Sequence, residues 1–131
     1  MRWDKMMDLA KKLAEKSDHP QHKMGCVIAI GSRVIAVGWN QVKTHTQSNS
    51  WGHYLHAEIH ALLGLRPYDM RGSTMYVCRV RKGGDMGMSK PCAACQAAIR
   101  AAGIKQVVYT NAQGLIWSYK PGEENGDEAS T

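Results

Sequence analysis

Two cysteines three residues apart open an alanine-rich segment, and both follow Pro91 directly, in the run Pro91-Cys92-Ala93-Ala94-Cys95. On one helix this spacing puts both sulfurs on the same face, and a proline at the first helical position loses no backbone hydrogen bond. The unpaired N–H groups and the positive dipole end at such a position favour thiolate over thiol. Two thiolates so placed supply half of a tetrahedral zinc site. Taken alone, a redox dithiol or two packed helix cysteines explain the motif about as well.

A second helix start offers an imidazole and a carboxylate. His56 and Glu58 precede an apolar helical pattern and stand two residues apart. Positions i and i+2 of a regular helix point to nearly opposite sides, so the two side chains converge only if His56 lies at the mouth of the helix. Two helix starts facing each other would then hold one histidine and two cysteines and leave a fourth position for water. A closed site with His60 as the fourth ligand is the alternative.

The elements that must position these residues follow from the hydrophobic periodicity. Helices are expected over residues 1–16, from residue 57 onward and from the cysteine motif to residue 102, and strands over 25–30, 33–39, 74–80, 106–110 and 115–119. The first two strands read as a hairpin around Gly31-Ser32, and neither alternates with polar residues, which predicts a sheet covered on both faces. Gly103 is expected to cap the third helix, and residues 111–114 to form a turn that makes the last two strands antiparallel.

This order of elements predicts an α/β fold, a three-layer α/β/α sandwich around one mixed five-stranded sheet. The 131 residues suffice for one domain, which we assign to residues 1–120. Residues 81–90 are expected to be a glycine-bearing basic loop. Residues 121–131 are acidic, small and without apolar anchors, and are predicted to be disordered.

Composition places the protein among globular chains. It is 44% hydrophobic and 21% charged. It contains no apolar run of about 18 residues, so no membrane helix is predicted. The first residues lack the apolar stretch of a secretory signal, so we expect an intracellular, cytoplasmic protein. The four cysteines are then expected as thiols or metal ligands, and Cys26 and Cys78, which fall in strands, as buried thiols.

The charge is unevenly spread along the chain. The formal net charge is +6, and the tail from Pro121 holds four acidic residues and no Lys or Arg, which leaves +10 on the rest. Such a body attracts anionic ligands, either nucleotides or nucleic acid. A basic surface without a specific partner explains the charge about as well.

His56-Ala57-Glu58 followed by Pro91-Cys92-Ala93-Ala94-Cys95 matches the H-x-E…P-C-x-x-C pattern of the zinc-dependent nucleoside and nucleotide deaminase superfamily. The runs GCVIAIGSRVIAVGWN and CQAAIRAAGIKQVVYT also resemble that superfamily, the first its hairpin and the second its third helix and fourth strand. The resemblance covers residues 24 to 119, and the deoxycytidylate-type members are the most similar.

The resemblance implies a role for each motif residue. The zinc ligands are expected to be His56, Cys92 and Cys95. Glu58 is expected to move protons without touching the Zn²⁺ ion, and an open zinc site lowers the pKa of a bound water from about 15.7 to about 7. Asn40 is expected to bind the substrate sugar and Ala57 to line the substrate site.

The expected reaction is hydrolysis of a cytosine nucleotide, of the dCMP or CMP type, to the uracil nucleotide and ammonia. His45, in a long polar insert, and Arg79, before the cysteine helix, are predicted to bind this small-molecule substrate near its phosphate. A polynucleotide substrate, either tRNA adenosine or single-stranded DNA cytosine, is the alternative that the +10 body favours and the acidic tail opposes. A non-catalytic zinc module is a third reading, opposed by Glu58. Members of the superfamily are usually oligomers, so a homo-oligomer is expected.

Overall fold

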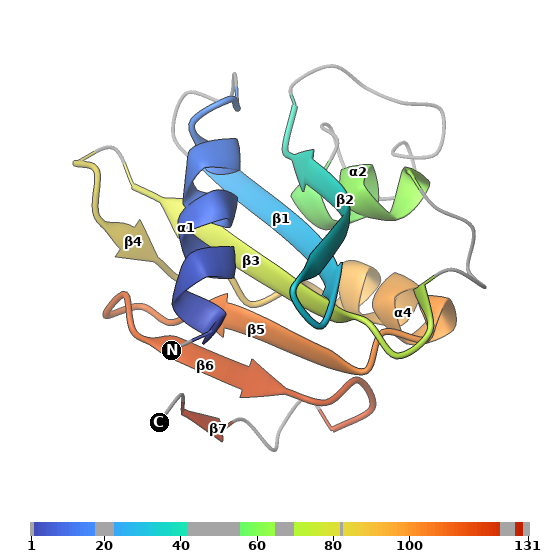
Figure 1. Ribbon diagram of the computed structural model, residues 1–131. Helices are drawn as coiled ribbons and strands as arrows, with labels where there is room; N and C mark the ends of the chain where they lie inside the picture. Colours follow the sequence, from blue (N-terminus) through green and yellow to red (C-terminus); the bar gives the residue numbers. More distant parts are fainter. Residues whose placement is uncertain are drawn as a thin grey trace.

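The computed structural model describes residues 2–17, 23–41, 56–64, 70–81, 83–123 and 128–129. The elements are α1 (Arg2–Ala14), β1 (Lys23–Ile30), β2 (Arg33–Trp39), α2 (Ala57–Leu63), β3 (Thr74–Val80), β4 (Met86–Gly87), α4 (Ala93–Ala102), β5 (Gln106–Thr110), β6 (Ile116–Tyr119) and β7 (Glu128–Ala129). The strands form one sheet in the order β2-β1-β3-β5-β6-β7, and β4 pairs with β3 outside this path. Helices lie on both faces of this sheet (Figure 1), which confirms the three-layer sandwich.

One face of the sheet is covered by α1. Met7, Ala10 and Leu13 point inward from this helix and join a buried cluster with Val27 of β1 and Tyr76 of β3. Their three-residue spacing is the apolar stripe expected of an amphipathic helix. Burying a Leu or Met side chain stabilises a fold by about 1.5–3 kcal/mol, so this stripe fixes which side of α1 meets the sheet.

The opposite face is covered by α2 and α4, which pack side by side. Ile59 and Leu62 of α2 meet Cys95 and Ala98 of α4 in a small apolar cluster. The short side chains on α4 let the two helices approach closely.

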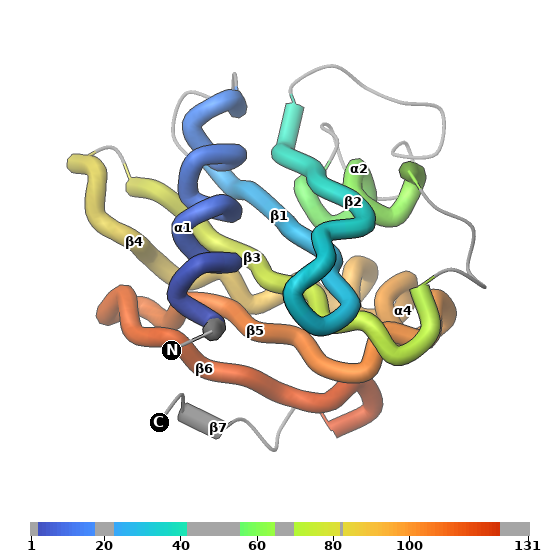
Figure 2. The backbone as a smooth tube through the Cα atoms, viewed as in Figure 1, coloured from blue at the N-terminus to red at the C-terminus, as the bar shows by residue number. Residues whose placement is uncertain are grey.

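The central strands β3 and β5 are the parallel pair of the sheet, with Val77 opposite Tyr109. All other pairings, including the hairpin of β5 with β6, are antiparallel. Figure 2 shows the chain leaving β3, turning back through β4 and returning through α4 into β5. The mixed character of the sheet is therefore as predicted, and α4 begins beside the end of β3.

One predicted turn and one predicted helix end are confirmed in detail. The N–H of Gly114 donates to the carbonyl of Asn111 at 2.9 Å, and Gly114 has φ 79°, which closes the tight turn between β5 and β6. Gly103 ends α4 in the left-handed conformation, with φ 81°. Both positions favour glycine because a side chain is strained at such φ values.

The sheet has more strands than the five predicted. Residues 81–90 were expected to be a loop, but Met86 and Gly87 form β4 and pair with Val80 and Arg79 of β3. The N–H of Arg81 donates to the Asp85 carbonyl at 2.8 Å and closes this second hairpin. Two-residue strands escape a pattern search because they are too short to show periodicity.

The tail and the first hairpin also differ from expectation. Glu128 pairs with Ser118 and Ala129 with Trp117 of β6, so these two residues lie on the sheet, while the expected disorder of residues 121–131 stays a prediction. The assignment of one domain to residues 1–120 stays a prediction. The sheet is covered on both faces at β1, whereas β2 lies at the edge of the sheet and leaves Val34 exposed.

Among the helices of the described residues, none combines the length and the apolar character needed to cross a membrane. All four cysteines lie within the described residues and none forms a disulfide. Cys26 and Cys78 are fully buried in β1 and β3, as predicted. Burial raises the pKa of both thiols, that of Cys78 to about 12, so both are protonated at neutral pH.

Gly38 of β2 is the point at which α2 approaches the sheet most closely. A Cβ atom at this position would lie 2.5 Å from the carbonyl oxygen of Ala57 and 2.5 Å from the amide nitrogen of Ala61. Both neighbours are helix backbone, which cannot move without displacing α2. We therefore expect Gly38→Ala to lower the free energy of unfolding by about 3 kcal/mol, measured by urea denaturation.

Gly83→Ala is the matched control, because a Cβ atom there meets only the Asp85 carboxylate at an ordinary 3.7 Å. Its free energy of unfolding should stay within about 0.5 kcal/mol of the unmodified protein. Equal urea midpoints for the two variants would contradict the close packing of α2 on β2.

Candidate metal centre and active-site pocket

Two helix starts face each other on the α2–α4 side of the sheet. His56 is the N-cap of α2, with extended backbone angles of φ −72° and ψ 148°, and so lies at the helix mouth as predicted. Cys92 is the N-cap of α4 and is likewise extended. Pro91 therefore precedes the cap and does not occupy the predicted first helical position. Because Ala93 is the first residue with helical backbone, α4 starts two residues later than the predicted first position, Pro91.

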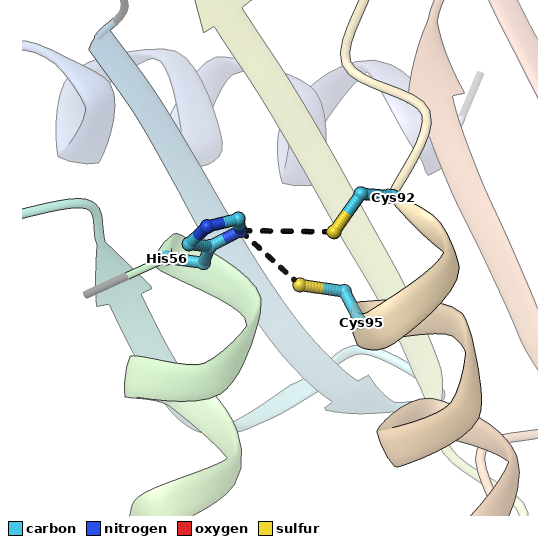
Figure 3. Close-up of side chains that lie close together, drawn as sticks. All are labelled: His56, Cys92 and Cys95. Atoms are coloured by element: carbon cyan, nitrogen blue, oxygen red, sulfur yellow. Dashed lines mark hydrogen bonds between the residues drawn. The ribbon is translucent and has the colours of Figure 1, made fainter. Parts of the chain in front are cut away.

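The structure brings His56, Cys92 and Cys95 together. Their ligand atoms all lie within 4.8 Å of one another. The Nδ1 atom of His56 lies 3.4 Å from the Sγ of Cys95 and 3.9 Å from the Sγ of Cys92, and Figure 3 shows the ring turned toward both sulfurs. These three residues, called the ligand triad below, were the predicted ligand set.

The spacing of the triad fits a tetrahedral zinc ion. Zinc bonds of about 2.3 Å to sulfur and about 2.0–2.1 Å to nitrogen place the two atoms about 3.6 Å apart at a tetrahedral angle. The two N···S distances of 3.4 and 3.9 Å lie on either side of this value. The described residues supply three protein ligands and no fourth. Open zinc sites of the catalytic type have this composition.

The thiol of Cys95 is where the structure modifies the electrostatic expectation. Burial raises the pKa of Cys95 above its ordinary value, and the neighbouring negative charges of Glu58 and Cys92 raise it further. The position at the start of α4 does not by itself produce a thiolate there. A coordinated metal cation reverses this preference, because a thiol that binds zinc is deprotonated.

Glu58 lies in the first turn of α2 and is 2% exposed. Burial raises the pKa of its carboxyl to about 7, against a hydrogen bond from its own backbone N–H that lowers it. Within the described part of the chain, its Oε1 atom has no hydrogen-bond partner. A buried polar atom without a partner is costly, so this oxygen is available to a ligand of the pocket.

A cavity of about 250 Å³ adjoins the triad. The residues that line it are Met24, Asn40, His56, Glu58, Arg79, Met88, Lys90 and Cys92. It thus joins two of the triad residues and the Glu58 carboxyl to the predicted substrate residues Asn40 and Arg79. The other lining residues, Met24, Met88 and Lys90, were not predicted as pocket residues.

Asn40 is buried at the end of β2 and its amide has a fixed orientation. Its Oδ1 accepts a hydrogen bond from the N–H of Met24 at 2.9 Å, and its own N–H donates to the Met24 carbonyl at 3.1 Å. These two hydrogen bonds hold Asn40 against β1, at the wall of the cavity.

His60 does not join the triad. Its Nδ1 atom lies 3.1 Å from the amide nitrogen of Trp39 and 3.1 Å from the Nε2 of Gln41, and its ring meets the Trp39 ring edge-on at 4.7 Å. The histidine fastens the end of β2 to α2. The closed site with His60 as fourth ligand is not what the structure shows, because the His60 ring packs against Trp39.

Two predicted substrate residues are not among the described residues that line the cavity. His45 falls in residues 42–55, which lie outside the described residues. Ala57 is fully buried in the core cluster beneath α2 and is not among the residues that line the cavity. Its proposed contact with substrate stays a prediction.

The segment that carries Cys92 is fixed by a buried pair of hydroxyl groups. Ser89 donates to the Val77 carbonyl at 2.8 Å, accepts from the Thr110 N–H at 2.7 Å and lies 2.9 Å from the Thr110 hydroxyl. The Thr110 hydroxyl donates to the Gly87 carbonyl at 2.5 Å. These bonds tie the chain just before Cys92 to the ends of β3 and β5.

We expect Thr110→Val to lower zinc affinity about tenfold, because groups that hold a ligand in place affect metal binding on this scale. The variant also leaves buried partners unsatisfied, at a cost of about 1–3 kcal/mol of unfolding free energy. Thr110→Ser keeps the hydroxyl and is the control. Chelator competition measures the zinc affinity, and equal affinities for the two variants would show that the hydroxyl does not position Cys92.

A family model described as the cytidine and deoxycytidylate deaminase zinc-binding region matches residues 1–111. The chain belongs to this family. Zinc is accordingly the metal of this deaminase, and the resemblance carried by the H-x-E and P-C-x-x-C motifs is confirmed. The triad supplies the donor types and the spacing that zinc requires.

Individual relatives agree with this assignment. The deoxycytidylate deaminase of Mycobacterium phage D29 is 29% identical over 129 residues, which span 82% of this chain and 93% of that protein. The deoxycytidylate deaminase of Schizosaccharomyces pombe is 29% identical over 126 residues, but the match covers only 36% of its length. A cytidine deaminase from Burkholderia pseudomallei has a TM-score of 0.69 at 24% identity, over 92% of this chain and 94% of that one. At that identity the likeness concerns the fold, which it confirms.

Among the pocket residues that were not predicted, Lys90 is the one that the sequence could have indicated. It directly precedes Pro91 and Cys92, so any residue at this position lies next to a zinc ligand. That adjacency was the available signal. It could not reveal which way the side chain points, because this depends on the tyrosines of β5 and β6 beneath it.

Proposed function

We propose that this deaminase hydrolyses a free cytosine nucleotide, of the dCMP or CMP type, to the uracil nucleotide and ammonia. The observation that carries the proposal is the ligand triad beside the buried Glu58 carboxyl, in one cavity. The names of the phage and fission-yeast relatives support dCMP as substrate. The cytidine deaminase of similar fold leaves the choice between nucleotide and nucleoside to the pocket.

His56, Cys92 and Cys95 would hold the zinc ion. When bound, zinc supplies Lewis acidity that makes water reactive near neutral pH. Among the residues of the chain, Glu58 is the proposed proton carrier, because it lines the cavity and its Oε1 has no protein partner within the described residues.

Glu58 has two proton transfers to perform. Its carboxylate takes a proton from the attacking water while the water oxygen bonds to C4 of the cytosine ring, and the proton passes to ring nitrogen N3. The carboxylate then takes the proton of the new C4 hydroxyl group and gives it to the amino nitrogen, so that the C4 carbonyl forms, the C4–N bond breaks and ammonia leaves. A positioned acid–base group contributes about 10²- to 10⁴-fold to such a rate.

Asn40 would orient the sugar of the substrate. Asn40 lines the cavity, and its amide group can hydrogen-bond a sugar hydroxyl, which both donates and accepts. The hydrogen bonds between Asn40 and Met24 hold the amide rigidly, so little conformational entropy is lost on binding. His45 and Ala57 remain proposed substrate contacts on the strength of the sequence.

The test of the proposal is deamination of a substrate panel by the zinc-loaded protein. Rates are compared for dCMP, CMP, deoxycytidine, cytidine, single-stranded DNA and tRNA, with ammonia release as the readout. We expect turnover of a free cytosine nucleotide. Activity confined to a polymer would overturn the proposal in favour of a polynucleotide deaminase. The basic charge of residues 1–120 supports this alternative.

A homo-oligomer and an intracellular, cytoplasmic location complete the proposal. The exposed apolar side chains Val34 and Val37 of edge strand β2 support self-association. The four free cysteines support a reducing compartment. Sedimentation velocity at several protein concentrations tests the oligomer, and a single monomer peak throughout would contradict it.

A further inference from the structure

We infer that Arg79 and Lys90 form an anion-binding wall of the active-site pocket, where they hold the phosphate monoester of the substrate. This inference rests on the proposed function and names the residues that make the deaminase select a nucleotide over a nucleoside. Both residues line the same cavity as Glu58, His56 and Cys92.

Arg79 reaches the pocket because of its place in β3. Side chains alternate along a strand, so Arg79 lies on the same face as Val77, which belongs to the core beneath α2 and α4. Its cross-strand partner in β1 is Met24, a second residue of the pocket wall. The guanidinium group thus extends from the end of β3 on the side of the sheet that carries the triad.

Lys90 is held over the neighbouring strands. Its Nζ lies 5.8 Å from the centre of the Tyr109 ring and 5.4 Å from that of Tyr119. The two rings lie 6.1 Å apart and tilt by 58°, so together they form a cradle for the ammonium group. Aromatic faces attract a cation without carrying a negative charge of their own, so these contacts position the lysine and preserve its attraction for an anion.

The two cations belong to one edge of the sheet. Tyr109 of β5 is the neighbour of Val77, and Arg79 lies two residues further along β3. Both side chains therefore stand where the carboxyl ends of the parallel strands β3 and β5 meet, which is where open α/β sheets bind ligands.

A nucleotide carries its reacting base and its phosphate in one molecule. The cavity offers the triad and Glu58 for the base and two permanent cations for an anionic group. Arginine and lysine bind phosphate oxygens through charge-assisted hydrogen bonds, which are stronger than those between neutral groups. A neutral nucleoside can use the first set of contacts but not the second.

The experiment removes the charge of Lys90 and compares two substrates. Lys90→Met keeps a long apolar side chain over the tyrosines. We expect the ratio of kcat/KM for dCMP to that for deoxycytidine to fall about 10- to 100-fold, mainly through KM for dCMP. Lys105→Met removes one exposed charge outside the pocket and should leave the ratio unchanged.

Calorimetric binding of dCMP to the zinc-loaded protein provides a readout that does not depend on turnover. We expect Lys90→Met to weaken binding about tenfold or more, and inorganic phosphate to compete with dCMP less well in this variant. If both substrates lose equally, or if dCMP binds both proteins alike, the anion-binding wall is wrong. If dCMP binds through Lys90 but is not deaminated, the wall stands and the proposed function fails.

Discussion

Glu58→Gln is expected to lower kcat about 10³-fold while the protein keeps its zinc and binds dCMP with similar affinity. Glutamine has the size of glutamate, so it fits the buried site at the start of α2. It cannot take up and release a proton as a carboxyl group does. Because Glu58 is not part of the triad, its replacement separates proton transfer from metal binding.

Steady-state kinetics and zinc analysis of the same preparation test this expectation. Glu15→Gln makes the same chemical change at an exposed residue directly after α1, and this variant should behave like the unmodified protein. Turnover by Glu58→Gln within threefold of normal would remove Glu58 from the mechanism. Loss of zinc in this variant would instead show that the carboxyl group supports the metal site.

The helix starts were predictable because their function imposes a sequence pattern. His56 and Glu58 stand two residues apart, and only an N-cap histidine lets both serve one site, which the backbone of His56 confirms. Residue type and spacing suggested the three ligands of the triad, and the resemblance to the deaminase superfamily assigned them. The central strands β1 and β3 were equally predictable from the sequence, because they are buried, near-continuous apolar runs.

Other features depend on contacts that no local pattern encodes. The short strand β4 exists because its backbone pairs with β3, although Met86 and Gly87 have no strand signal of their own. The start of α4 lies two residues later than predicted, because Cys92, and not a residue before Pro91, takes the cap position. Lys90 gains its place from Tyr109 and Tyr119, which are 19 and 29 residues away in the sequence.

Zinc binding and packing of the cysteines can be separated by two substitutions. Cys92 is exposed and contributes a sulfur to the triad, whereas Cys78 is fully buried on the opposite face, beneath α1. We expect Cys92→Ala to bind no zinc at stoichiometric concentration and to lose activity at least about 10³-fold, because the open site needs three protein ligands and the metal supplies several kcal/mol. Atomic absorption and ammonia release measure the two losses.

Cys78→Ala should show the reverse pattern. It removes a buried sulfur, which costs about 1–2 kcal/mol of unfolding free energy, but its thiol has no part in the ligand set and zinc content should stay normal. A metal that binds only the folded state raises the melting temperature by mass action. Chelation should therefore lower the Tm of Cys78→Ala from an already reduced value and leave that of Cys92→Ala unchanged. Cys92 belongs to the triad and Cys78 does not. A zinc-free Cys78→Ala variant, or a Cys92→Ala variant that still melts at a higher temperature with zinc, would therefore show that the metal binds elsewhere in the fold.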